Sequence, residues 1–220
     1  MCISIWWTDY GTVHSEFMAS VLKTLNDDSF DRKLICSIGN RSGSSLSLNR
    51  NSAMEAFLNT ECETVLLIDA DTLWTKDLVY SLYDNLINNN LDILSAVTYY
   101  FDQDGQIKPI AFNKTDYGIV HANLESDIQE IDLTGMGAIL IKRKVIESTA
   151  LQNNYSWNKG NYWFAEVSED GFIGEDFFFF NNVKKTGYIL YIDSKTNVPH
   201  IKKKSLVTKD FYINRMINGN

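Results

Sequence analysis

Two aspartates separated by one residue, Asp69 and Asp71, directly follow a short apolar segment at residues 65–68. Carboxylates two positions apart at the end of a strand present several oxygens along one edge, and Mg²⁺ or Mn²⁺ prefers carboxylate, water and phosphate oxygens. Acidic pairs at strand ends often cap the next helix, but Thr72 and Thr75 are available for capping here. We therefore expect Asp69 and Asp71 to bind a divalent cation together with phosphate oxygens.

The elements that must position this pair alternate along the first half of the chain. Apolar runs predict strands, and apolar residues recurring at helical spacing predict the helices between them. The strands are expected at residues 2–8, 34–38, 65–68 and 93–100, and the helices at residues 15–25, 48–58 and 78–87. This order is typical of a parallel, doubly wound sheet, in which ligands bind beyond the carboxyl ends of the strands. Asp69 and Asp71 fall at that end.

The second half of the chain has a different pattern. A turn at residues 102–105 predicts a hairpin, and further strands are expected at residues 128–133, 138–141 and 188–192. Residues 153–174 are polar, aromatic and irregular, as in a substrate-facing loop, and helices are expected at residues 176–185 and 211–217. We expect one α/β domain over residues 1–220, with a mixed, mostly parallel central sheet flanked by helices.

The charge and the cysteine content limit the partners and the cellular compartment that can be expected. The net charge of −8 opposes polyanions, although a cluster of late lysines offers either a basic edge or a solvated surface: Lys184, Lys185, Lys202, Lys203, Lys204 and Lys209. The three cysteines, without C-x-x-C spacing, predict reduced and mostly buried thiols. No signal peptide or membrane-length apolar run is evident, so we expect a cytoplasmic protein, in a host cell if phage-encoded.

Three ordered segments resemble GT-A glycosyltransferases, most closely the compact family-2-like enzymes of bacteria and phages. Residues 65–74 resemble the D-x-D segment of that family, and residues 135–141 with Lys142-Arg143 resemble its glycine-containing acceptor-side strand. Residues 174–179, Gly-Glu-Asp-Phe-Phe-Phe, resemble the E-D motif that opens the helix bearing the catalytic base. The resemblance implies a GT-A (Rossmann-like) domain with a nucleotide-sugar-binding half at residues 1–100 and an acceptor-side half at residues 101–220.

The resemblance also assigns roles around the cation, which would be Mn²⁺ or Mg²⁺. Asp71 would ligate it directly, while Asp69 would bind the donor ribose or reach the metal through water. His200, after Asn197-Val198-Pro199, stands where such enzymes often supply a third ligand. Because a metal ligand must be neutral imidazole, metal binding should weaken when His200 is protonated. A surface histidine is the alternative.

Asp176, beside Glu175, is implied as the general base. In inverting transfer a carboxylate deprotonates the acceptor hydroxyl while the metal stabilises the leaving diphosphate. Alternatively, Glu175 and Asp176 only favour a helix N-terminus through the helix dipole. A retaining enzyme of the same fold would not need Asp176 as its base, so the stereochemical outcome stays open although inversion, with hexosyl or pentosyl transfer, is expected.

The donor and acceptor would be bound by further residues. Thr8, Asp9 and Tyr10 match the place where family members hold the nucleotide base, with UDP-sugars favoured, although Trp7-Thr8 replaces the frequent Pro-Thr pair and leaves the base open. Arg50 could pair with the diphosphate, because its planar fork suits phosphate oxygens. Gly135 lies on the implied acceptor side. Trp157 and Trp163 are candidates for stacking on an acceptor ring, or else ordinary core aromatics.

Other classes fit the residues less well. A haloacid-dehalogenase-type phosphatase would need threonine or valine where Leu73 stands, and a sugar nucleotidyltransferase would need a G-x-G-x-R loop after the first strand. A non-catalytic sugar- or nucleotide-binding relative is the main alternative to an enzyme. The acceptor stays open among glycans, lipids and a hydroxylated base in phage-type modified DNA, and the net charge opposes DNA.

Overall fold

A seven-stranded sheet forms the centre of the computed structural model, which describes residues 2–152, 163–168, 171–172, 174–196, 198–202 and 205–207. Across the sheet, the order is β2 (Ile35–Ser42), β1 (Ile3–Asp9), β3 (Thr64–Asp69), β11 (Ala138–Lys142), β4 (Ile93–Ala96), β14 (Leu190–Asp193) and β9 (Ile128–Ile131). Strands β11 and β9 run antiparallel to their neighbours and the other five strands share one direction, so the sheet is mixed and mostly parallel, as expected.

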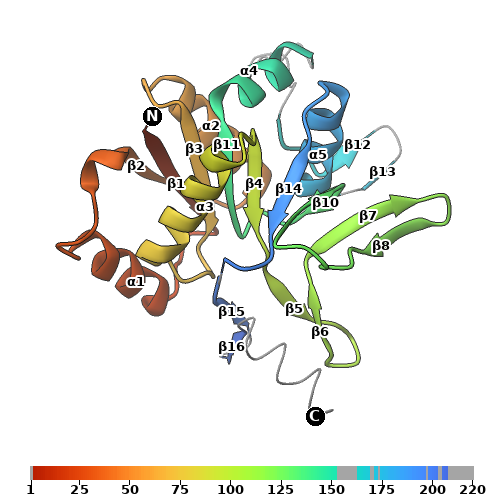
Figure 1. The fold of residues 1–220 in the computed structure, drawn as a ribbon, viewed down its shortest axis with the longest axis horizontal. Coiled ribbons are helices and arrows are strands. Elements are labelled where there is room, and N and C mark those ends of the chain that lie inside the picture. Colours follow the sequence, from red (N-terminus) through yellow and green to blue (C-terminus); the bar gives the residue numbers. More distant parts are fainter. Residues whose placement is uncertain are drawn as a thin grey trace.

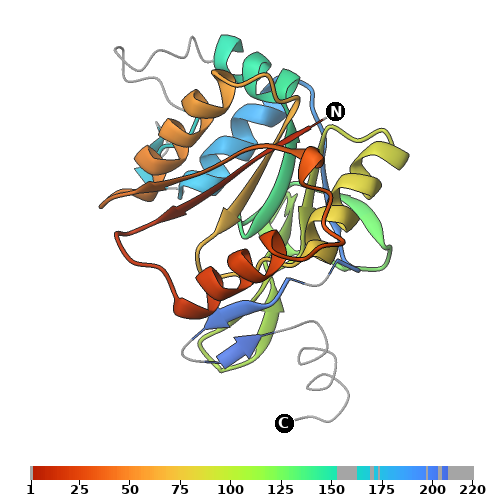
Figure 2. The ribbon, with the colours of Figure 1, turned by 90° about the vertical axis from the view of Figure 1, so that its left-hand side faces the viewer.

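Helices cover both faces of this sheet (Figures 1 and 2). The helices are α1 (Ser15–Leu25), α2 (Leu46–Leu58), α3 (Lys76–Asn88), α4 (Arg143–Gln152) and α5 (Glu175–Lys185). Buried side chains of α2, α4 and α5 share one hydrophobic cluster, represented by Phe57, Ile146 and Phe179. Those of α1 and α3 share the other, represented by Phe17 and Leu82. The predicted fold class, α/β with a mixed central sheet flanked by helices, is confirmed.

The helix boundaries follow local capping chemistry. The side chains of Ser45 and Thr75 accept hydrogen bonds from Leu48 N and Leu78 N, which satisfies otherwise free donors in the first turns of α2 and α3. Both helices therefore begin two residues earlier than expected. Thr75 caps as anticipated, and Thr72 does not cap: its hydroxyl donates to the backbone oxygens of Asp69 and Gly137.

Several expected boundaries were wrong. Strand β2 continues to Ser42, beyond the expected end at residue 38, because it pairs with β1 along its whole length. The expected strand at residues 93–100 is split between β4 and β5 (Tyr99–Phe101). Helix α4 was not anticipated. Within the expected irregular loop, β12 (Val167–Ser168) pairs with β13 (Gly171–Phe172), and the expected helix at 211–217 lies outside the described residues.

Smaller two- and three-stranded sheets accompany the central sheet. The predicted hairpin is present as β5 and β6 (Ile107–Pro109), and a three-stranded sheet contains β10 (Leu133–Thr134), β7 (Ala111–Thr115) and β8 (Gly118–His121). Strands β15 (His200–Lys202) and β16 (Ser205–Val207) form another pair. In Figure 1, β15 and β16 lie beside β5 and β6, below the central sheet.

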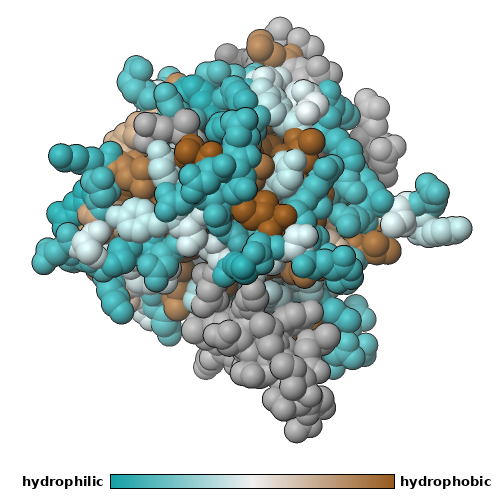
Figure 3. Space-filling view, viewed as in Figure 1, coloured by the Kyte–Doolittle hydropathy of each residue, from teal (hydrophilic) through white to brown (hydrophobic). Residues whose placement is uncertain are grey.

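Two features concern the apolar character of the helices and of the surface. Within the part of the chain that is described, no helix combines the length and apolarity needed to cross a membrane. The face shown in Figure 3 is mostly hydrophilic, with small separate hydrophobic areas.

The cysteines correct one expectation. Cys36 and Cys62 are paired as a disulfide, with Cα atoms 6.3 Å apart, whereas three reduced thiols were expected. Cys62 is fully buried, Cys36 is exposed and the free Cys2 is half-buried, so mostly buried thiols were also the wrong expectation.

Candidate active site

The carboxyl ends of β1 and β3 meet at a cavity. Thr8 on β1 stands beside Asp69 on β3, because the two parallel strands stay in register from Ile3 and Thr64 onward. The cavity has a volume of about 410 Å³. It is lined by residues from these strand ends and the loops that follow them: Thr8, Asp9, Tyr10, Thr12, His14, Leu46, Asp69, Ala70 and Asp71. Five site residues expected from the sequence therefore line one cavity: Thr8, Asp9, Tyr10, Asp69 and Asp71.

Asp69-Ala70-Asp71 forms a tight turn fixed by the backbone. The N–H of Thr72 donates to Asp69 O (3.1 Å), and the N–H of Asp69 donates to Gly137 O on the neighbouring segment (3.2 Å). A Cβ on Gly137 would lie 2.4 Å from Thr98 Cγ2, so this close approach requires glycine. The two aspartates are thus held by strand β3 and by the residue that precedes β11.

His200 is brought against Asp71 from the far end of the chain. Leu73 N donates to Pro199 O (2.8 Å) and Ile201 N donates to Asp71 O (2.7 Å), so the two segments pair as a short antiparallel bridge. Nε2 of His200 consequently lies 2.9 Å from Oδ2 of Asp71. The histidine is 4% exposed, and it was expected at this place from the resemblance.

The tautomer of His200 follows from its other nitrogen. Nδ1 lies 3.1 Å from the carbonyl oxygen of Tyr99, which can only accept, so Nδ1 carries a proton. In neutral imidazole Nε2 then presents a lone pair, and this buried atom has no hydrogen-bond partner despite its closeness to Asp71. Two ligands of one ion, each about 2.1 Å from it and at a right angle, are about 3.0 Å apart. The pair therefore fits a shared divalent cation.

Arg50 on α2 joins three carboxylates. Its guanidinium lies 2.8 Å from Asp69 Oδ1 and 2.5 Å from Glu175 Oε1, and it also contacts Asp176 Oδ1. Burial alone would lower the pKa of Arg50, but Asp176, Asp69 and Glu175 raise it above its ordinary value, so the cation persists. Arg50 is 2% exposed, so its guanidinium interacts with these carboxylates and hardly with solvent. In this arrangement Arg50 fixes the three acidic groups, and its pairing with a diphosphate stays a prediction.

Asp176 begins helix α5 beside these charges. Gly174 precedes the helix with φ of +73°, a conformation that favours glycine, and this directs Glu175 and Asp176 toward Arg50. The pKa of Asp176 is raised to about 7, chiefly by burial and also by the nearby Glu175 and Asp69, against the opposing effect of Arg50. A carboxyl group tuned near neutrality is suited to proton transfer. A Cβ on Gly135 would lie 3.7 Å from Asp176 Oδ2, so Gly135 stands next to this carboxyl.

Asp9 and Tyr10 have different surroundings at the cavity. The Asp9 carboxylate accepts hydrogen bonds from Gly11 N (2.8 Å) and Ser42 Oγ, and its backbone oxygen accepts from Asn49 Nδ2 (2.9 Å). Asp9 thus fixes the loop that follows β1. Tyr10 is 66% exposed, and its phenol pKa is raised by partial burial and by Glu175. Its ring is accessible for stacking beside the acidic groups.

Of the two tryptophans expected to contact an acceptor, the structure describes one. Trp163 is 1% exposed, and its indole N–H donates to Ile146 O (3.1 Å), so it is a core residue and the expected acceptor contact is wrong. Trp157 lies outside the described residues. Conversely, His14 and Thr12 line the cavity and were missed. Their position directly after the first strand was the available signal.

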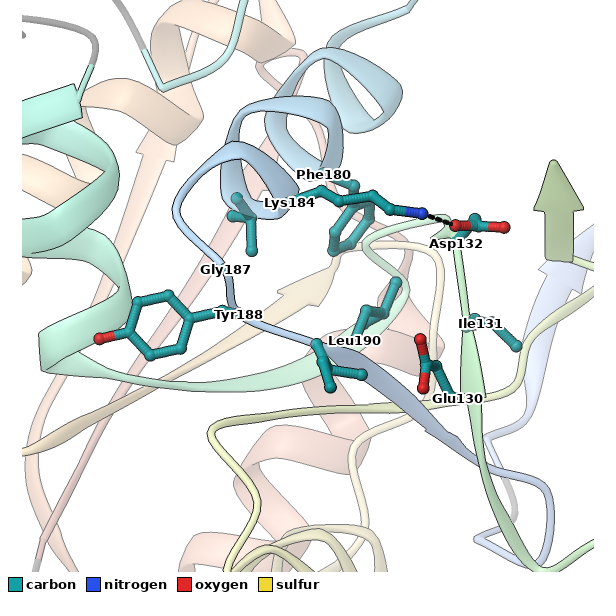
Figure 4. A pocket seen from close by; sticks show the side chains of 10 residues that line it. Glu130, Ile131, Asp132, Phe180, Lys184, Gly187, Tyr188 and Leu190 are labelled. Carbon is teal, nitrogen blue, oxygen red and sulfur yellow. Dashed lines mark hydrogen bonds and ion pairs between the residues drawn. The ribbon is translucent and has the colours of Figure 1, made fainter.

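A second hollow, of about 140 Å³, lies between α5 and strands β9 and β14 (Figure 4). Its apolar floor includes Phe180 and Leu190. At its rim Lys184 is paired with Asp132, so one of the late lysines is already neutralised. The hollow shares no lining residue with the cavity at Asp69.

Comparisons with known proteins identify the fold. No family model matches the chain, and no curated protein matches it. Among solved structures, the crystal structure of A197 from STIV, a virus protein, matches with a TM-score of 0.62 at 17% identity. The match covers 96% of this chain and 91% of that chain. The chain therefore shares the overall fold of A197.

Proposed function

We propose that this protein is a metal-dependent glycosyltransferase that moves a sugar from a nucleotide-diphosphate sugar to a hydroxyl acceptor. The observation that carries the proposal is the placement of His200 Nε2 at 2.9 Å from Asp71 Oδ2, at the edge of a cavity that also holds Asp69. Through Arg50, Asp69 is linked to Asp176, a carboxyl with a pKa near neutrality. The proposed cation ligands and the proposed proton acceptor are therefore both linked to the Asp69–Asp71 turn.

Asp71 and His200 would hold the cation, Mn²⁺ or Mg²⁺, with Asp69 helping through water or through the donor ribose. When bound, the cation supplies positive charge to the leaving diphosphate. The exposed ring of Tyr10 would stack on the nucleotide base, and a UDP-sugar remains the favoured donor. Arg50 would keep Asp69 and Asp176 in fixed positions, which limits reorganisation during the reaction.

Asp176 would accept the proton of the acceptor hydroxyl. As that oxygen forms its bond to the anomeric carbon, the bond from the same carbon to the diphosphate oxygen breaks, and the nucleoside diphosphate leaves with the electron pair. This sequence inverts the anomeric centre. Glu175 would tune the proton affinity of Asp176 through their shared contact with Arg50.

The function is tested by incubating the purified chain with a panel of sugar nucleotides, with and without Mn²⁺ or Mg²⁺. We expect thermal stabilisation by one donor that requires the cation, and slow release of its nucleoside diphosphate. Asp71→Ala should lose both effects. Stabilisation without any turnover, in the presence of hydroxyl acceptors, would favour a non-catalytic sugar-nucleotide-binding protein. Neither effect with any donor would contradict both functions.

A further inference from the structure

The chain has three cysteines, and all of them converge at one place. Cys2 immediately precedes β1, Cys36 lies at the start of β2, and Cys62 lies just before β3. Because β2, β1 and β3 are adjacent and parallel, their amino ends share one edge of the sheet, opposite the edge that bears Asp69. The three Sγ atoms lie within 4.8 Å of one another.

Cys36 and Cys62 are paired in the structure, so opening their disulfide and rotating these short side chains would let all three sulfurs reach one metal ion. Three thiolates, each about 2.3 Å from a common ion, are about 3.8–4.0 Å apart. The disulfide between Cys36 and Cys62 is one redox state of the cluster. A thiol or phosphine reductant that supplies two electrons, with two protons from water, converts that disulfide to two thiols, and Cys2 then provides the third.

The backbone around the sulfurs is fixed before any ion binds. Arg143 donates from Nε to Cys62 O (2.9 Å) and from Nη2 to Thr60 O (2.6 Å), which holds the loop that carries Cys62. Thr64 donates from both its N–H (3.3 Å) and its hydroxyl (3.0 Å) to Cys2 O. Ordered ligand backbones lower the entropy cost of binding.

Solvent reaches the cluster from one side. Cys62 is buried, Cys2 is half-buried and Cys36 is exposed, so an ion can enter past Cys36 and keep a water as its fourth ligand. Thiolates select soft cations, whereas the carboxylates and imidazole at Asp71 suit harder ones. We propose that Cys2, Cys36 and Cys62, once the disulfide is reduced, form a three-thiolate site for a soft divalent cation such as Zn²⁺. Each thiol releases its proton to solvent when the ion binds.

Cobalt(II) is a suitable probe, because its thiolate complexes have charge-transfer absorption in the near ultraviolet that oxygen and imidazole ligands do not give. The full chain, stripped of metal and kept in a phosphine reductant, is titrated with Co²⁺. We expect a charge-transfer band that saturates at one equivalent and is displaced by Zn²⁺. Without reductant, the disulfide should prevent the band from forming.

Variants separate this site from the rest of the protein. Cys2→Ser and Cys36→Ser, which are not buried positions, should each weaken Co²⁺ binding by at least about tenfold. Asp71→Ala should leave the band unchanged, since it belongs to the proposed active site. Absence of the band in the reduced chain would overturn the proposal, as would a band of unchanged affinity in either serine variant. Circular dichroism of each variant excludes loss of fold as the cause of a lost band.

Discussion

Nε2 of His200 lies 2.9 Å from Oδ2 of Asp71, although the two residues come from opposite parts of the chain. The backbone bonds from Leu73 N to Pro199 O and from Ile201 N to Asp71 O leave little freedom in this placement. With Nδ1 donating to Tyr99 O, the neutral ring directs an acceptor atom at a carboxylate oxygen. Two acceptors so close require either a proton or a metal ion between them.

The first prediction distinguishes these two cases. If a cation joins the pair, His200→Ala should weaken Mn²⁺ binding by about 10–100-fold or more, because a ligand is lost. If instead a protonated His200 forms an ion pair with Asp71, the same change should leave Mn²⁺ affinity unchanged or increase it, since Asp71 is released. Calorimetric titration of Mn²⁺ in the presence of a nucleoside diphosphate measures the difference. His121→Ala is the matched control: its Nδ1 also contacts a backbone oxygen, that of Pro109, but it lies on β8.

The second prediction concerns Asp176. Asp176→Asn should bind the donor normally and lose transfer by about 10²–10⁴-fold, the usual contribution of a general base. In the wild type only the carboxylate can accept a proton, and its pKa in the metal-free protein is about 7. Transfer should therefore increase as the pH rises toward 7 and level off above it; a bound cation would move this limb to lower pH by favouring the carboxylate.

Glu175→Gln supplies the internal check on that assignment. Removing a negative charge beside Asp176 removes one of the causes that raise its pKa, so the acid limb of kcat/KM should move to lower pH while transfer persists. Wild-type rates in Asp176→Asn would contradict the role of general base. An acid limb that stays in place in Glu175→Gln would show that another group titrates.

Much of the fold was predictable because apolar periodicity reports directly on burial. The segment of α1 and the order of β1, β2, β3 and β4 with their intervening helices followed from this pattern. Helix α4 was missed because apolar residues do not mark its buried face. Leu151 is exposed, whereas the polar Thr149 is fully buried. Strand β2 was underestimated because its side chains alternate between half-buried and exposed environments and include polar residues.

The site was only partly predictable for a different reason. Asp69 and Asp71 are next to each other in sequence, so a local motif identifies them. The partner of an arginine is decided by tertiary packing, and no local pattern indicated that Arg50 would meet Glu175 and Asp176, which lie far along the chain. Trp163 could likewise be placed in the core only once Ile146 O was available as the acceptor for its buried N–H.

The third prediction tests Arg50 as the residue that organises these carboxylates. Arg50→Gln leaves Asp69, Glu175 and Asp176 without their shared cation and should cost about 3–5 kcal/mol of stability near pH 8. Without the guanidinium, which lowers the pKa of Asp176, that pKa rises further in the folded state. The folded protein then binds more protons than the unfolded chain, so the variant's stability must fall as pH increases.

Urea unfolding at pH 5 and at pH 8 measures this dependence. The deficit of Arg50→Gln relative to wild type should be smaller at pH 5, where protonated carboxyls no longer repel one another. Arg50→Lys is the matched control, because it keeps the charge but loses the planar fork that reaches several partners, and its deficit should be smaller and depend less on pH. Equal deficits at the two pH values for Arg50→Gln would argue that Arg50 acts through packing alone.

The fourth prediction concerns Gly137, whose carbonyl oxygen accepts hydrogen bonds from the Asp69–Asp71 turn. A methyl group there would lie 2.4 Å from Cγ2 and 3.2 Å from Oγ1 of Thr98, which is buried, so Gly137→Ala should cost about 1–3 kcal/mol through overpacking. Because Gly137 O accepts from Asp69 N and from Thr72 Oγ1, the resulting shift should also weaken Mn²⁺ binding. Thr98→Ala removes both clashing atoms, so the double variant should recover most of the stability and metal affinity that Gly137→Ala loses. Additive losses in the double variant, measured by the same urea unfolding and Mn²⁺ titration, would show that the Thr98 contact is not the reason for glycine at this position.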